Sequence, residues 1–222
     1  MKKNYYYIVF GLGVATFIGT AIYLFINERK NKKTKCNSKF LFVGDSNTAA
    51  FYSYADVLKN FCPDAKVVKI AEVGKGTGWM LENFENHLKE GGKYDVITIF
   101  GGSNDLGNPN QQKTYENLNK MYDLAKSNGA VLVAVTPPNK NFVWGENRTC
   151  NPNSEYCKYL PQNIERLKNL INFIKTNKKP NYVLDYYKIT SYEPNLSSDK
   201  VHGTPTAHNL LFNEFKNKVL SA

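Results

Sequence analysis

The sequence predicts a three-layer α/β/α sandwich around a five-stranded parallel sheet, preceded by one N-terminal transmembrane helix. From residue 38 onward, apolar runs typical of strands alternate with helical patterns. Such alternation indicates parallel strands joined by right-handed crossovers. The strand segments are also continuous apolar runs, as expected for strands that helices cover on both faces. An uncharged apolar segment near the N-terminus predicts the transmembrane helix.

Segment 5–26 contains no charged residue. As a helix rising ~1.5 Å per residue it would reach ~33 Å, which is enough to cross a bilayer. A cleaved signal peptide is the alternative, but no clear small-x-small cleavage site follows the apolar run. We therefore expect a flank at 1–4, a transmembrane helix at 5–26, a basic linker at 27–37 and a folded domain at 38–222.

The net charge of +10 is concentrated at the N-terminus. Within the first 35 residues, seven lysines and arginines face one glutamate, so the rest of the chain carries only +4. Such juxtamembrane cations ordinarily lie against anionic lipid headgroups or fix topology. No basic stripe with interleaved aromatic residues, zinc finger or RNA-binding signature follows. We therefore expect a membrane contact and no nucleic-acid partner.

The strands are the short β-rich apolar runs, and the helices are the longer amphipathic segments between them. In chain order, strands are predicted at 40–43, 66–70, 95–100, 131–135 and 182–184. Helices are predicted at 50–61, 79–90, 112–128, 161–176 and 206–220. Residues 139–159 form a long, polar, Asn-rich connection after the fourth strand. Loops of this length are usually functional or disordered.

The first predicted strand ends in residues 44–48, Gly-Asp-Ser-Asn-Thr, a polar turn that presents Ser46. Such a turn can cap the next helix, because Asp and Ser oxygens accept hydrogen bonds from free backbone N–H groups. It can also hold a nucleophile at the carboxyl end of a parallel strand, where open α/β sheets place their sites. A nucleophilic serine needs a base, an orienting group and donors for the oxyanion.

Two further strand ends offer oxyanion donors. The third strand runs into residues 101–105, Gly-Gly-Ser-Asn-Asp, where the Asn104 amide can donate a hydrogen bond or can simply close a turn. The second strand runs into a Gly-rich segment that matches neither the phosphate-loop nor the dinucleotide pattern. Its backbone N–H groups at a helix N-terminus suit an oxyanion, with Gly74 as first choice and Gly76 as second.

The base must be one of three histidines. His87 lies in a polar helical stretch and is expected to be a solvated surface residue, and His208 lies inside the last helix and is expected to be structural. Asp199 precedes His202 by three residues, so its carboxylate can hold the imidazole Nδ1–H and leave Nε2 to take the Ser46 proton. No His/Cys set has metal-ligand spacing, so we expect neither a metal nor a cofactor.

These motifs follow one another in a fixed order along the chain. In this order the sequence resembles the SGNH (GDSL) hydrolase family, in its small serine esterase branch, from residue 39 to the C-terminus. The resemblance implies a flavodoxin-like SGNH hydrolase fold and a triad of Ser46, Asp199 and His202. It also implies an oxyanion hole formed by the N–H groups of Ser46 and Gly74 and by the Asn104 side chain.

Two positions depart from the family pattern. The Gly-rich block lacks the more usual Asn-x-Gly-x-x-Gly spacing, so Gly76 stays an alternative to Gly74. Asn47 stands where the family's Gly-Asp-Ser block usually continues with Leu, which is more similar to the compact esterases of the broader group than to its lipase branch.

We expect a membrane-anchored serine esterase that hydrolyses small acyl esters, acetyl first of all, on carbohydrate or cell-envelope polymers through an acyl-Ser46 intermediate. The carbohydrate part rests on the resemblance, with support from Trp79 and Trp144 near the site. The alternatives are a lysophospholipase or thioesterase acting on a lipid ester, an acyltransferase, and a non-catalytic binding protein of the same fold.

Signals for the side of the membrane conflict. Five Lys/Arg after segment 5–26 outnumber the two before it, which favours a cytoplasmic domain. Cys150 and Cys157 lie close together in a polar loop and predict a disulfide, and segments 147–149 and 195–197 fit the glycosylation sequon. Cell-envelope substrates would also lie outside. We expect a single-pass protein with an extracytoplasmic domain.

Overall fold

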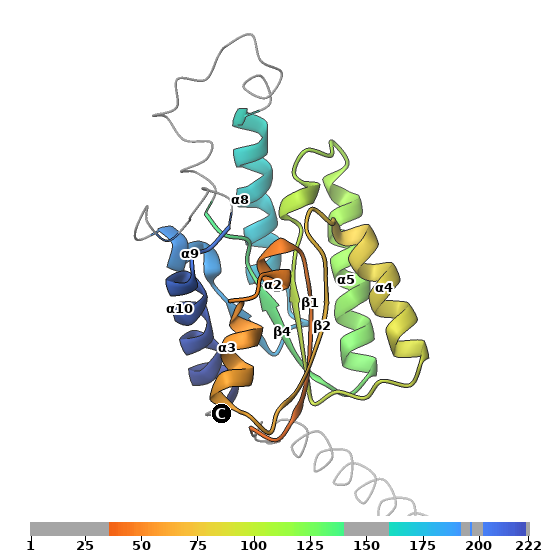
Figure 1. The fold of residues 1–222 in the computed structure, drawn as a ribbon. Coiled ribbons are helices and arrows are strands. Elements are labelled where there is room, and N and C mark those ends of the chain that lie inside the picture. Colours follow the sequence, from red (N-terminus) through yellow and green to blue (C-terminus); the bar gives the residue numbers. More distant parts are fainter. Residues whose placement is uncertain (1–35, 140–159, 192–195, 197–201, 221–222) are drawn as a thin grey trace, which may run out of the picture. The chain divides into compact units, whose positions relative to one another are not determined.

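The computed structural model describes residues 36–139, 160–191, 196 and 202–220, in which strands and helices alternate (Figure 1). Thr34–Ser221 belong to one compact unit. Within the described ranges, no helix is both long enough and apolar enough to cross a membrane. The transmembrane helix predicted at 5–26 lies outside these ranges and stays a prediction.

The sheet confirms the predicted architecture. It contains β1 (Lys39–Gly44), β2 (Lys66–Ala71), β3 (Val96–Phe100), β4 (Val131–Val135) and β5 (Tyr182–Leu184). All four neighbouring pairs are parallel, in the order β2-β1-β3-β4-β5. The order reverses at β1, which has β2 on one side and β3 on the other. Open α/β sheets bind ligands at the carboxyl end of such a reversal.

The register brings three strand ends level with one another. Gly44, the last residue of β1, pairs with Ala71 at the end of β2 and with Phe100 at the end of β3. The turns that follow these three strands therefore leave the sheet at one edge. They are the turns that carry Ser46, the Gly-rich segment and Asn104.

The helices differ from prediction at four places. Those near the predicted positions are α2 (Ser46–Ala49), α3 (Tyr54–Phe61), α4 (Thr77–Lys89), α5 (Gln111–Ser127), α8 (Leu160–Thr176) and α10 (Pro205–Phe215). The helix predicted at 50–61 begins only at Tyr54, because the chain turns at residues 50–53, and the short helix α2 before this turn was not predicted. The last predicted helix ends as a π-helix (Lys216–Leu220), and a short 3₁₀ helix (Ser103–Asp105) follows β3. Helix α9 (Tyr186–Ser191) was not predicted.

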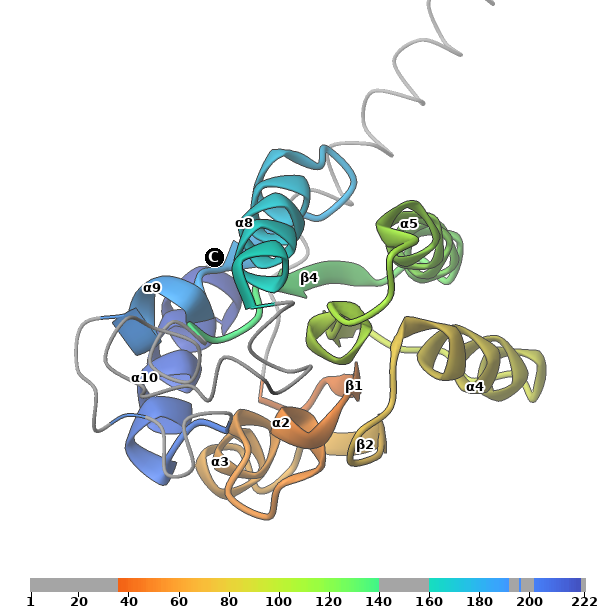
Figure 2. The ribbon, with the colours of Figure 1, turned by 90° about the horizontal axis from the view of Figure 1, so that it is seen from above.

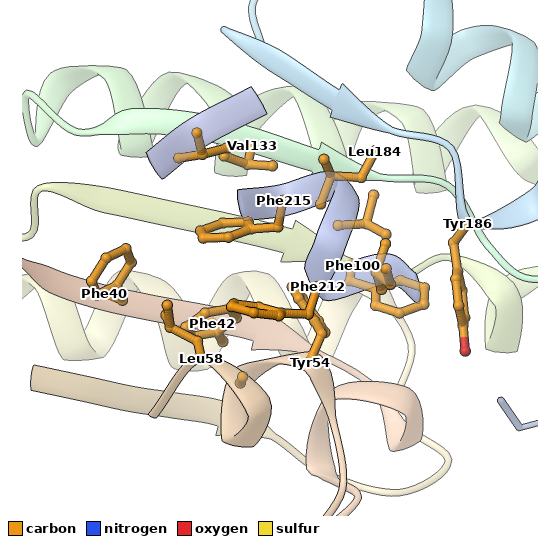
Figure 3. Packing of buried hydrophobic residues seen from close by; sticks show 14 of the residues in the cluster. Phe40, Phe42, Tyr54, Leu58, Phe100, Val133, Leu184, Tyr186, Phe212 and Phe215 are labelled. Carbon is orange, nitrogen blue, oxygen red and sulfur yellow. The ribbon is translucent and has the colours of Figure 1, made fainter. Parts of the chain in front are cut away.

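Helices cover both faces of the sheet (Figure 2). Because successive strand side chains point to opposite faces, Phe40 and Phe42 of β1 join one core, and Leu41 and Val43 join the other. The first core packs on α3 and α10 and is rich in aromatic residues (Figure 3). In it, the rings of Phe42 and Tyr54 meet edge to face with centroids 5.1 Å apart. The second core packs on α4, α5 and α8.

A disulfide joins Cys36 to Cys62, whose Cα atoms are 4.9 Å apart. It links the segment before β1 to the residue that ends α3, and no sequence pattern predicted this pairing. The predicted pair, Cys150 and Cys157, lies outside the described residues. The disulfide therefore ties part of the predicted linker 27–37 to the folded domain.

Candidate active site

Ser46 is the first residue of α2, immediately beyond the end of β1. The buried Asp45 caps this helix, since its Oδ1 accepts a hydrogen bond from the Asn47 backbone N–H at 3.0 Å. A Cβ on Gly44 would collide with the Thr48 side chain and would lie 2.8 Å from the Phe100 carbonyl oxygen. Glycine is needed at this position because the turn passes so close to β3. The Ser46 side chain is left half-exposed at the edge of the sheet.

His202 meets this serine from the other end of the chain. Its Nε2 lies 2.8 Å from Ser46 Oγ, which is hydrogen-bond distance. The histidine sits just before α10, whose N-cap is Thr204; the Thr204 hydroxyl accepts from the Ala207 N–H at 3.3 Å. A serine hydroxyl bonded to an imidazole nitrogen is the arrangement in which a base activates a nucleophile. Asp199 lies outside the described residues, so its orienting role stays a prediction.

The two turns that follow β2 and β3 touch each other. The Asn104 side chain is exposed, and its Nδ2 donates a hydrogen bond to the Lys75 carbonyl at 2.9 Å. An amide nitrogen has two N–H groups, so one can remain for another acceptor. Gly74 has a positive φ of 76°, a backbone conformation that favours glycine, and no atom lies within 4 Å of where its Cβ would be.

Asp105 distinguishes Gly74 from Gly76 as candidate oxyanion donors. Its carboxylate accepts from the Thr77 N–H and the Thr77 hydroxyl, both at 3.0 Å, and so caps the start of α4. A Cβ on Gly76 would lie only 2.8 Å from Asp105 Oδ1. An oxyanion at Gly76 would therefore face a carboxylate, which disfavours it by charge repulsion. Gly74 is free of this neighbour.

The other two histidines differ from each other. His208 is fully buried between the rings of Tyr52 and Tyr186, at centroid distances of 5.7 and 5.6 Å. Burial lowers the pKa of His208 to about 4, and neither ring nitrogen has a hydrogen-bond partner among the described residues. His87 is not the solvated residue that was expected, because it is half-buried and hydrogen-bonded to the Tyr94 hydroxyl.

Two further findings complete the site. The Gly203 N–H donates to Asn47 Oδ1 at 3.3 Å, a contact that no sequence pattern predicted because 156 residues separate its partners. Within the part of the chain that the structure describes, no group of three or more His, Cys, Asp or Glu side chains could hold a metal ion.

Solved structures share this fold. The lipase/acylhydrolase from Enterococcus faecalis aligns with a TM-score of 0.61 and 22% identity, over 82% of this chain and 96% of that one. A member of the lipolytic G-D-S-L family from Veillonella parvula gives 0.65 and 13%, over 81% and 96%. A psychrotrophic esterase from Pseudoalteromonas sp., solved in a form inhibited by monoethylphosphonate, gives 0.56 and 16%, over 82% and 97%.

The comparison with curated proteins found no match. The sequence itself carries the family assignment, because residues 40–215 match the family described as "GDSL-like Lipase/Acylhydrolase". This match covers most of the chain and includes both Ser46 and His202. The chain therefore belongs to the GDSL-like lipase/acylhydrolase family and is a serine hydrolase of the SGNH type.

Proposed function

We propose that the protein is a serine esterase in which Ser46 attacks the ester carbonyl carbon and His202 is the base. The observation that carries this proposal is the 2.8 Å contact between Ser46 Oγ and His202 Nε2 at the carboxyl end of β1. The hydroxyl proton passes to Nε2 as the tetrahedral intermediate forms, and the imidazolium then protonates the leaving alcohol. Water attacks the acyl-Ser46 ester with the same base. Asp199 is proposed to orient the ring through Nδ1–H.

The oxyanion is proposed to form beside three donors, which are the N–H groups of Ser46 and Gly74 and the side-chain amide of Asn104. The last residue of β1 pairs with the last residues of β2 and β3, so the turns that carry these donors leave the sheet at the same edge, which supports this grouping. Gly74 is preferred to Gly76 because the Asp105 carboxylate lies beside Gly76. The second N–H of Asn104 is available while the first is bonded to the Lys75 carbonyl.

For the substrate, we propose small acyl groups, acetyl first, esterified to a carbohydrate or cell-envelope polymer. An open groove of about 580 Å³ supports a sugar-containing partner. It lies between α3 and α10, and its rim includes Pro205, three residues after His202. Its lining combines aromatic rings with side-chain amides: Tyr52, Phe61 and Phe212 with Asn60, Asn209 and Asn213.

The groove chemistry suits sugars for two reasons. Aromatic faces can pack against the apolar faces of sugar rings, and amides can both donate to and accept from hydroxyl groups. No hydrogen bond among the described residues uses the side-chain amides of Asn60, Asn209 or Asn213. Asn209→Ala should therefore raise KM for an acetylated oligosaccharide and leave KM for p-nitrophenyl acetate unchanged. Equal KM values in variant and wild type for both substrates would remove the groove from substrate binding.

One observation favours the second candidate, hydrolysis of longer acyl chains from a lipid or thioester. Phe51 is 93% exposed and Val73 is 70% exposed, on the turns that follow α2 and β2. Apolar side chains at this edge could receive an acyl chain. A panel of p-nitrophenyl esters from acetate to palmitate, hydrolysed by the full-length protein in detergent, separates the two candidates. Highest kcat/KM for acetate supports the first, and highest kcat/KM for palmitate supports the second.

We also propose that segment 5–26 anchors the protein and that the folded domain faces away from the cytoplasm. The Cys36–Cys62 disulfide supports this side, because disulfides persist in oxidising compartments. The cations after segment 5–26 argue for the opposite topology, but charge is a bias rather than a strict rule. Thiol alkylation of intact cells, without prior reduction, followed by mass spectrometry tests the proposal. Alkylation of both Cys36 and Cys62 would contradict it.

A further inference from the structure

The residues that directly follow the nucleophile and the base are bonded to each other. Asn47 follows Ser46, Gly203 follows His202, and the Gly203 N–H donates to Asn47 Oδ1 at 3.3 Å. Asn47 is only 2% exposed and Gly203 is also buried, so water competes little for this bond. The bond runs beside the 2.8 Å contact between Ser46 and His202. The two loops are therefore joined twice, once by the reacting groups and once by their neighbours.

Gly203 also lies close to Tyr186. A Cβ on Gly203 would collide with the Tyr186 hydroxyl, and would also lie 3.3 Å from the Ala207 Cβ. Tyr186 is fully buried at the start of α9, and its ring meets Phe100 edge to face at a centroid distance of 5.4 Å. Asn47 Oδ1 thus binds the N–H of Gly203, and the Tyr186 hydroxyl occupies the space in which a side chain at position 203 would begin.

Asn47 is itself held in place by Asp45. Its backbone N–H donates to Asp45 Oδ1 at 3.0 Å, and its Nδ2 lies 3.5 Å from the same oxygen. The other carboxylate oxygen accepts from the hydroxyl of Ser103, in the 3₁₀ helix that follows β3, at 3.4 Å. An amide suits position 47 because it donates toward the carboxylate and accepts from the Gly203 N–H. Leucine, the usual residue in the family pattern, could do neither.

We propose that Asn47 and Tyr186 are positioning residues, which hold Gly203 between them and so keep His202 Nε2 at hydrogen-bond distance from Ser46 Oγ. This proposal rests on the proposed function, in which Ser46 and His202 carry the reaction. Neither positioning residue touches the ester. Their contribution comes from geometry, because a displacement of about 1 Å between reacting groups can cost ~10²-fold in rate.

The first test replaces Asn47 with leucine, whose side chain has the same number of heavy atoms and the same branching but no hydrogen-bond acceptor. For p-nitrophenyl acetate, Asn47→Leu should lower kcat by ~10- to 10²-fold with KM within about twofold, because the ester contacts are kept and the base is displaced. Labelling of Ser46 by a fluorophosphonate should slow by a similar factor, since the serine is less activated. Circular dichroism and thermal melting measure the fraction of each variant that is folded, and kcat is calculated per folded molecule.

The matched control is Asn128→Leu. Asn128 accepts from the Tyr94 N–H at 3.1 Å and donates to the Gly92 carbonyl at 2.8 Å, on the loops that precede β3 and β4, at the amino edge of the sheet. It undergoes the same substitution and loses two hydrogen bonds, but it lies far along the strands from Ser46. Asn128→Leu should lower Tm and keep the wild-type kcat of the folded protein. A purely structural role for Asn47 would give Asn47→Leu the same profile, which would overturn the proposal.

A second set of variants tests the Tyr186 side even if Asn47→Leu folds poorly. Gly203→Ala should lower kcat, and adding Tyr186→Phe should restore part of it by removing the hydroxyl that the new methyl group meets. The restoration is partial because the Tyr186 Cζ also lies 2.8 Å from the position that this methyl group would take. A double variant no more active than Gly203→Ala would contradict the confinement by Tyr186.

The proposed function and the positioning role can be contradicted separately. If Ser46→Ala and His202→Ala keep activity, the proposed function is wrong. If both are inactive while Asn47→Leu has the wild-type kcat, the catalytic pair stands and the positioning role is wrong.

Discussion

The two halves of the proposed site are built differently. On the nucleophile side, Asp45 and Asn47 are buried, and hydrogen bonds connect the Ser46 turn to Gly203 and His202. On the oxyanion side, Gly74 and Asn104 are exposed, and the Asn104 bond to the Lys75 carbonyl joins their turns. For Gly74 the difference follows from the sheet. The Ser46 turn leaves a central strand flanked by two others, whereas the Gly74 turn leaves β2, which is an edge strand.

This contrast separates the tasks of the two halves. The reacting groups are held in position before substrate arrives, and burial keeps their supporting hydrogen bonds from competing with water. The proposed oxyanion donors Gly74 and Asn104 are exposed, which leaves them accessible to an ester from solvent. We therefore expect substitution of the proposed reacting groups, Ser46 and His202, to abolish chemistry, and loss of one oxyanion donor to weaken it by a limited factor.

The largest expected effect is that of Ser46→Ala. It should lower kcat by ~10⁴-fold or more with little change in Tm, because the hydroxyl reacts and does not pack. His202→Ala should be nearly as severe. A fluorophosphonate probe read out by gel fluorescence should label the wild type and not Ser46→Ala. Labelling that persists in Ser46→Ala would assign the nucleophile to another residue.

Asn104→Ala tests the exposed half and should have a smaller effect. Loss of one oxyanion donor usually costs ~10²–10³-fold in kcat with a lesser change in KM. Asn108, an exposed asparagine in the same loop, provides the control, since Asn108→Ala removes only an acceptor for the Asn110 N–H. Steady-state kinetics on p-nitrophenyl acetate compare the two. Similar kcat values for both variants would show that Asn104 is not an oxyanion donor and only stabilises its turn.

His208 should influence stability rather than catalysis. Its pKa is lowered by burial from 6.5 to about 4 in the folded protein, so between these values the unfolded chain binds more protons. Its contribution to stability is present above pH 6.5, is lost as the pH falls toward 4, and amounts to about 3 kcal/mol at most. His208→Leu should flatten this part of the Tm–pH curve and keep kcat within a few fold. An unchanged slope would show that other groups control it.

The smallest expected effect is that of chelation. Activity should be the same with and without EDTA, because hydroxyl, imidazole and backbone donors supply the whole reaction. Parallel assays of the purified protein before and after dialysis against EDTA measure it. Activity that is lost on dialysis and restored by zinc would contradict the triad mechanism in both halves of the site.

The sequence by itself determined the sheet, because buried parallel strands are continuous apolar runs and need no distant partner to be recognised. All five strands lie within two residues of their predicted bounds. It also placed Ser46, Gly74 and Asn104 on strand ends, since turn residues follow strands locally. The same local reasoning assigned His202, in a loop, as the base and His208, in a helix, as a structural residue.

Only the tertiary structure decided what depends on contacts between distant segments. The helix predicted at 50–61 begins at Tyr54, after a turn that separates it from α2 and places Tyr54 against Phe42. Helix α9 is too short for its periodicity to be recognised in the sequence. The Cys36–Cys62 pairing joins two residues that are 26 positions apart in the sequence and that meet only through the packing of β1 and α3. The bond from Gly203 to Asn47 likewise forms only when the last helix folds back onto the first strand, because nothing local to either residue specifies the other.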